Sequence, residues 1–123
     1  MSDLRPKGTK IKLGNNEYGM RFTLNAIDEI QDHFNISIED LTDLFQDGKK
    51  RIKALKFLLM TLINEDIDCL KDETGEAKDH ITEAYVGRHI DASNMQDMMS
   101  QILKTFTASL PERDDDSPNS QSE

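Results

Sequence analysis

The chain has 123 residues and a formal net charge of −9, with 36% hydrophobic and 32% charged residues. This length suits one ordinary domain, and the composition is polar without reaching the low-hydrophobicity, high-charge range of disordered chains. The negative charge argues against nucleic-acid binding, which depends on Lys and Arg neutralising phosphates, and no stretch approaches the roughly 18 apolar residues of a membrane span.

Residues 1–8 are expected to be a flexible N-terminus. The start of the chain lacks the apolar stretch of a signal peptide, so the protein should stay in the compartment where it is made. Cys69 is the single cysteine and has no partner for an internal disulfide, which fits a reducing compartment. These features predict a cytoplasmic protein.

Residues 9–13 alternate between polar and apolar side chains, and so do the residues around Tyr18, Met20 and Phe22. The segment between them is Gly-Asn-Asn-Glu, residues 14–17, and Gly and Asn tolerate the positive φ of tight turns. We therefore expect a β-hairpin, which must pack on helices because a lone hairpin is marginally stable.

Two helices should follow the hairpin. Thr23 can cap a helix over residues 24–34 whose apolar residues recur at helical spacing, with Phe22 placed to pack on Ile27. Ser37 offers a second hydroxyl cap, and the short helix after it should end near Gly48.

Residues 50–63 give the strongest helix signal, and the basic run from Lys49 to Lys56 should be its solvated start. The face expected in the core consists of Ile52, Leu55, Leu59, Leu62 and Ile63. Three further apolar residues, Phe57, Leu58 and Met60, fall off this face. A helix that is apolar nearly all round is either buried centrally or contacted on two sides.

The polar residues 72–76 indicate a loop before a helix over residues 83–90, which Thr82 can cap. Residues 93–96 resemble a capping box that opens a last helix over residues 94–110, stopped by Pro111. Residues 111–123 contain no aliphatic or aromatic side chain, so we expect a disordered acidic tail. The fold class is then α+β and helix-dominated, with one domain over residues 9–110 that packs an N-terminal hairpin on about five helices.

The sequence contains no Gly-rich phosphate loop, no zinc-type cysteine pair, no His-Glu-x-x-His and no nucleophile elbow. The acidic residues between Asp66 and Glu76 do not fit a calcium loop, whose turn glycine would fall on Lys71 or Ala77. We therefore expect no catalytic residue, no cofactor and no metal, and a protein that acts by binding another protein.

Two apolar sets are candidates for partner binding. One is the surplus of the strong helix, and the other is the methionine stripe of the last helix, where Met side chains serve either as core filling or as an adaptable groove. The candidate partner-binding residues are Phe57, Leu58, Met60, Met95, Met98 and Met99.

The order of these elements supports a family resemblance. The stretches that carry it are Lys-Ile-Lys-Leu-Gly from Lys10, Glu-Tyr-Gly-Met-Arg-Phe-Thr-Leu-Asn-Ala-Ile-Asp-Glu-Ile from Glu17, and Asn-Ile-Ser-Ile-Glu-Asp-Leu from Asn35. Over residues 9–65 the chain resembles small tail assembly chaperones of long-tailed bacteriophages and gene transfer agents.

The resemblance implies a protein that binds the helical tape measure protein and keeps it soluble while the tail tube polymerises. It also implies residence in the host cytoplasm and absence from the mature virion. The tail tube protein is a further possible partner, and self-association is also possible. No catalytic motif is carried over.

Two other classes of function stay open. A small acidic regulatory protein could bind and inhibit a host or phage protein through its charge, which would require acidic residues concentrated on a folded face. An enzyme or metal protein could form its site only in three dimensions, from residues such as His33, Glu65, Asp66 and His80.

Overall fold

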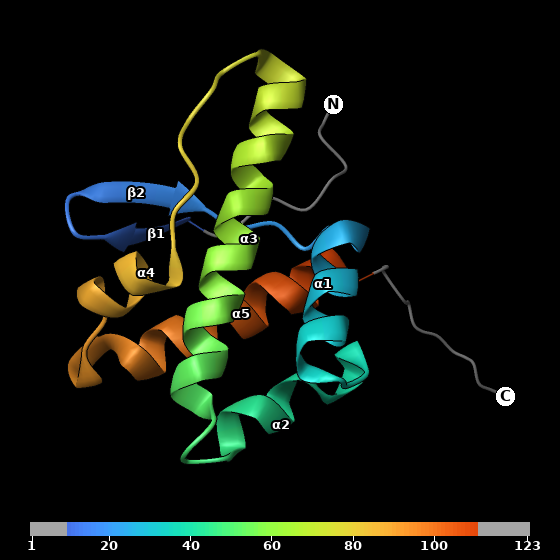
Figure 1. Ribbon diagram of the computed structural model, residues 1–123, viewed down its shortest axis with the longest axis vertical. Helices are drawn as coiled ribbons and strands as arrows, with labels where there is room; N and C mark the ends of the chain where they lie inside the picture. The colour runs from blue at the N-terminus through green and yellow to red at the C-terminus, as the bar shows by residue number, and fades with distance from the viewer. Residues whose placement is uncertain (1–9, 111–123) are drawn as a thin grey trace, which may run out of the picture.

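The computed structural model describes residues 10–110, so the expected flexible N-terminus (1–8) and acidic tail (111–123) lie outside the described residues. The elements in chain order are β1 (Lys10–Leu13), β2 (Asn16–Gly19), α1 (Leu24–Phe34), the 3-10 turn η1 (Ile38–Asp40), α2 (Leu41–Gln46), α3 (Arg51–Thr74), α4 (Glu83–His89) and α5 (Ala92–Ser109) (Figure 1). The expected helix-dominated α+β fold with an N-terminal hairpin is confirmed. No helix in this described range is long and apolar enough to cross a bilayer.

The hairpin is antiparallel, and its register pairs Ile11 with Tyr18 and Leu13 with Asn16 around a two-residue turn. Only Gly14 of this turn has a positive φ, +62°, which fits a type II′ turn. Ile11, Leu13 and Tyr18 are buried, so one face of the hairpin closes the core. The alternating pattern in the sequence predicted this face.

Helix α3 is the centre of the domain. It contacts β2, α1, α2, α4 and α5, and Figure 1 shows it running through the middle of the molecule with the other elements around it. Its buried side chains lie on every side of the helix: Ala54, Leu55, Phe57, Leu58, Leu59, Thr61, Leu62, Ile63 and Ile67. Of the two explanations for a helix that is apolar all round, central burial is confirmed.

The prediction is wrong for one residue of the expected core face of α3. Ile52 is 52% exposed, although the periodicity assigned it to the core. It lies in the first turn of α3, and the helical pattern of the sequence does not reveal where the neighbouring elements stop covering the helix.

Helix α3 also runs to Thr74, so the prediction of a loop over residues 72–76 is wrong for its first three residues. Gly75 ends the helix with a φ of +81°, and its N–H donates to the Lys71 carbonyl at 2.8 Å. Ile67 continues the buried face one turn beyond Ile63. Glycine, rather than the polar run before it, sets the boundary.

Arg21 ties the segment between β2 and α1 to the second half of α3. Its Nε donates to Asp66 at 2.9 Å, and its two terminal nitrogens donate to the Glu73 carboxylate at 2.7 and 3.1 Å. The Arg21 backbone N–H donates to the Leu62 carbonyl at 3.2 Å. The pKa of Arg21 is raised above its ordinary value, and the largest cause is its hydrogen bonding to Glu73. This bidentate contact between Arg21 and Glu73 holds the polar C-terminal end of α3 against the rest of the domain.

The expected caps at Thr23 and Thr82 are confirmed, since their hydroxyls accept from the N–H groups of Ala26 and Tyr85. The last helix begins two residues earlier than predicted. Asp91, not Ser93, is its cap, because the Asp91 carboxylate accepts from the Asn94 N–H at 3.3 Å while the Asn94 side chain accepts from the Asp91 N–H at 2.9 Å. The capping box is real but shifted along the chain.

Replacement of glycines by alanine tests the turn geometry. A Cβ at Gly14 would lie 2.8 Å from Cδ2 of His89 in addition to requiring a positive φ, whereas Gly75 has a positive φ and open space, and Gly48 has open space alone. We expect Gly14→Ala to lower the free energy of unfolding by more than about 1–2 kcal/mol, Gly75→Ala by about 1 kcal/mol, and Gly48→Ala by almost nothing. Urea denaturation of the three variants measures this order, and equal effects would contradict the packing of His89 on the turn.

Candidate partner-binding surface

The residues expected to bind a partner lie mainly in the core. Phe57, Leu58, Met98 and Met99 are buried, with Phe57 8% exposed, while Met60 and Met95 pack at the edge of the core. Phe57 and Leu58 are therefore not an exposed apolar surplus, because the elements around α3 cover them, and Met98 and Met99 on α5 are part of the core. That these six residues bind a partner stays a prediction.

Phe57 is covered by aromatic side chains from α1. The His33 ring stacks on it with 3.8 Å between centroids and 6° between planes, and the Phe34 ring meets it edge-on at 5.4 Å. His33 itself is exposed, so it shields Phe57 from solvent while remaining in contact with water. This cluster fixes α1 against α3.

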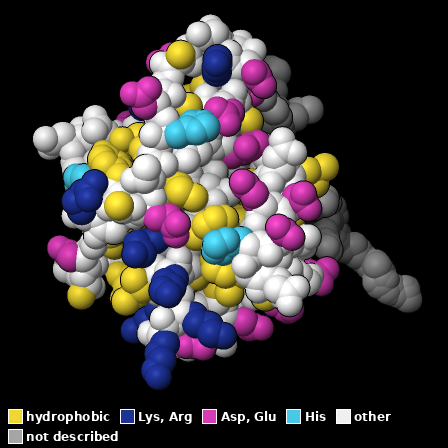
Figure 2. Space-filling view, viewed as in Figure 1, with side chains coloured by type: hydrophobic (Ala, Val, Ile, Leu, Met, Phe, Trp, Pro, Cys, Tyr) yellow, Lys and Arg dark blue, Asp and Glu magenta, His cyan; other side chains and the backbone are white. Residues whose placement is uncertain are grey.

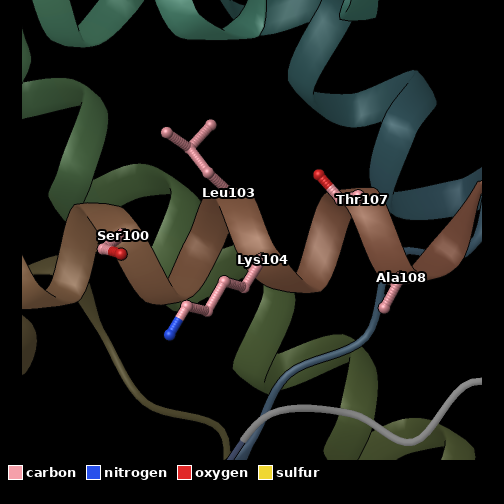
Figure 3. A pocket seen from close by; sticks show the side chains of 5 residues that line it. All are labelled: Ser100, Leu103, Lys104, Thr107 and Ala108. Atoms are coloured by element: carbon pink, nitrogen blue, oxygen red, sulfur yellow. The ribbon is translucent and has the colours of Figure 1, made fainter.

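A shallow hollow with a partly apolar lining lies along α5. Ser100, Leu103, Lys104, Thr107 and Ala108 line a shallow hollow of about 390 Å³ on this helix (Figure 3). Their spacing of three and four residues places them along two turns, and the short side chains around Leu103 leave room beside the helix backbone. In Figure 3 Leu103 and Thr107 point to one side of α5, and Lys104 and Ala108 point to the other. We call these five residues the α5 row.

Further exposed apolar side chains lie in the segments around the C-terminal end of α5. Phe22 contacts Phe106 with ring centroids 5.3 Å apart, which brings the start of α1 beside the end of α5. Leu24 is 83% exposed and Leu110 is 46% exposed. The α5 row was not predicted from the sequence, although the small residues at positions 100, 107 and 108 were the available signal.

Charge is distributed unevenly over the surface. Residues 22–48 contain seven carboxylates and no Lys or Arg, namely Asp28, Glu29, Asp32, Glu39, Asp40, Asp43 and Asp47. All seven are exposed, on α1, η1, α2 and the turn that follows. The basic run follows immediately, and Figure 2 shows Lys and Arg gathered toward the end of the molecule where α3 begins.

The three histidines do not converge. His33 stacks on Phe57, His80 lies 2.8 Å from an Asp68 oxygen, and Nδ1 of His89 lies 2.9 Å from the Tyr85 carbonyl. No group of three His, Cys, Asp or Glu residues between positions 10 and 110 could hold a metal ion.

The carboxylates considered for a site formed only in three dimensions have structural partners. Asp66 accepts from Arg21, and Glu65 accepts a hydrogen bond from the Thr23 hydroxyl at 2.5 Å. Burial is the largest cause that raises the pKa of the Cys69 thiol, so this thiol is a weak nucleophile at neutral pH. The hydrogen bonds of Glu65 and Asp66 therefore attach α3 to the segment between β2 and α1.

A pair of tyrosines joins the hairpin to α4. The Tyr18 hydroxyl donates to the Tyr85 oxygen at 3.0 Å, and the Asn16 side chain donates to the same oxygen at 3.3 Å. Burial, and next the bond to Tyr85, raises the pKa of Tyr18 to about 12, whereas the hydrogen bond from Tyr18 lowers the pKa of Tyr85. Nothing in the local sequence pattern predicted this contact, which joins residues 67 positions apart.

Comparisons with protein-family models, with curated proteins and with solved structures found no match for this chain.

The burial of Phe57 predicts a loss of stability on substitution by an acid. Phe57→Asp should lower the free energy of unfolding by at least about 3 kcal/mol, because it removes a buried ring and leaves a carboxylate among apolar side chains. Thr107→Asp, on the exposed row of α5, should change it by no more than about 0.5 kcal/mol. Thermal or urea denaturation measures both, and similar stabilities would show that Phe57 is not part of the core.

The tyrosine pair predicts two separate phenol titrations, which absorbance can follow because the chain has two Tyr and no Trp. Tyr85 should ionise below the ordinary value of about 10, and Tyr18 near 12. Since the raised pKa favours the neutral form in the fold, the stability that Tyr18 contributes is complete below about pH 10 and is lost as the pH rises toward 12. Tyr85→Phe should move the Tyr18 titration only part of the way to 10, because burial remains. A single titration of both groups near 10 would contradict the pairing.

Proposed function

We propose that this chain is a tail assembly chaperone that binds a helical segment of a tape measure protein and keeps it soluble during tail tube assembly. The observation that carries the proposal is the α5 row, an exposed, partly apolar strip along a helix. The order of elements, a hairpin, a capped helix, a short helix and a long Leu-rich helix, agrees with the resemblance over residues 9–65.

The shape of the α5 row suits a helix better than a small molecule. Five residues of a single helix line the hollow, so it lies open along α5, unlike pockets that enclose most of a ligand. Ridges of one helix pack into grooves between the side chains of another, and short residues such as Ser100 and Ala108 allow close approach. An amphipathic partner helix could bury its apolar side chains against Leu103 in this way.

Co-expression with the tape measure protein encoded beside this chain tests the proposal. We expect the chain to raise the soluble yield of the tape measure protein and to co-purify with it. Thr107→Arg should reduce the recovered complex about tenfold, because a long charged side chain fills the hollow. Gln46→Arg, an equal change of charge on exposed α2, should leave recovery unchanged.

The outcomes separate the function from the surface. If the tape measure protein stays insoluble in the presence of the unmodified chain, the chaperone function is wrong. If both Arg variants recover as much complex as the unmodified chain, the function stands and the α5 row is not its binding surface. Circular dichroism of both variants establishes that they are folded.

A second candidate function is a small acidic regulator that binds and inhibits a host or phage protein. The observation that favours it is the run of seven exposed carboxylates over residues 22–48, because these acids belong to elements of the folded domain and not to the tail. Binding through this face would weaken strongly as salt rises from about 0.1 to 1 M, because exposed charges are screened. Binding through the α5 row would depend on salt much less.

A further inference from the structure

We infer that the N-terminal end of α3 is a second binding surface, for a short acidic segment of a protein partner. This inference does not depend on the chaperone proposal. The surface consists of Lys49, Lys50, Arg51, Lys53 and Lys56, which we call the α3 basic surface.

These cations form no close ion pair among the described residues, although the Lys50 charge is one of the smaller causes of the lowered pKa of Asp47. None of the five forms an ion pair with any residue from 10 to 110. The neighbouring acid, Asp47, uses one oxygen to accept the backbone N–H groups of Lys49 and Lys50 at 2.9 and 3.2 Å, and these bonds lower its pKa. Asp47 therefore organises the turn while the lysine side chains stay available.

The position of the cations opposes the ordinary electrostatics of a helix. The first turn of α3 contains no acidic residue, and its N-cap residue, Lys50, makes no side-chain cap. The N-terminus of a helix carries partial positive charge, and like charges three residues apart, such as Lys50 with Lys53 and Lys53 with Lys56, repel each other. A bound group of carboxylates would relieve both sources of repulsion.

The surface extends toward α4 through Lys56. A Cβ at Gly87 would lie 3.0 Å from Cδ of Lys56, so the aliphatic part of this lysine passes along α4. Arg88 follows Gly87 on that helix and is exposed. In Figure 2 the basic side chains form a group with acidic side chains at its border.

The size and surroundings of this surface favour an acidic protein segment over nucleic acid. From Arg51 to Lys56 the helix rises about 8 Å, which matches a few carboxylates. A longer polyanion that extended toward α2 would meet the carboxylates of residues 22–48 and be repelled. Residues 49–56 also contain no aromatic side chain on which an unpaired base could stack. A protein segment can place its acids on the basic surface and uncharged residues elsewhere.

Fluorescence anisotropy with a labelled peptide containing four consecutive acids, Asp-Glu-Asp-Glu between Gly and Ser residues, tests the inference. The full chain should bind this peptide at about 50 mM salt, bind it far less at about 300 mM, and ignore the same peptide with Asn and Gln in place of the acids. The double variant Lys50→Gln with Lys53→Gln should bind about tenfold more weakly.

The matched control is Lys10→Gln with Lys71→Gln, which removes the same charge from exposed lysines on β1 and at the far end of α3. It should retain the affinity of the unmodified chain. Equal weakening in both double variants, or no preference for the acidic over the neutral peptide, would overturn the inference. Tighter binding of a single strand or duplex of about 20 nucleotides than of the peptide would overturn the choice of partner. This length is chosen to span both the α3 basic surface and the carboxylates of residues 22–48. The Lys50 and Lys53 variant should unfold at an equal or higher temperature, because it removes repulsion.

Discussion

The burial of the middle of α3 on all sides is the constraint on which the other elements depend. Between Ala54 and Ile67 the buried side chains lie around the whole circumference of the helix, and no single neighbour can cover them. The hairpin, α1, α2, α4 and α5 each cover one part of its surface. Each of these elements needs only one apolar face, because it gains its stability by packing on the same helix.

Polar contacts then fix how the covering elements sit. Arg21 attaches the segment before α1 to Asp66 and Glu73, and the Tyr18 and Tyr85 hydroxyls attach the hairpin to α4. Asn64 adds a third contact, because its side chain both accepts from and donates to the backbone of Ile81 before α4. These bonds join segments far apart in sequence, so they select one arrangement among the several that apolar packing alone would allow.

The most apolar residues of the chain are buried, so the surfaces that reach solvent in the fold are other ones. Phe57, Leu58, Met98 and Met99 hold the domain together, while the outer strip of α5 and the charged ends of α1, α2 and α3 face solvent. The two proposed surfaces differ in chemistry, one partly apolar and one basic. They would therefore respond differently to salt, which separates their partners experimentally.

The sequence by itself determined the local features: the hairpin with its glycine turn, the start of α1 at Thr23, the start of α4 at Thr82 and the presence of a last helix before Pro111. Each depends on side chains within a few residues of one another, so pattern and cap chemistry suffice. Only the tertiary structure decided that α3 continues to Thr74, that Ile52 is exposed and that Phe57 is covered by His33. These outcomes depend on which distant elements come to lie beside a residue, and helical periodicity describes the face of a residue without identifying its neighbour.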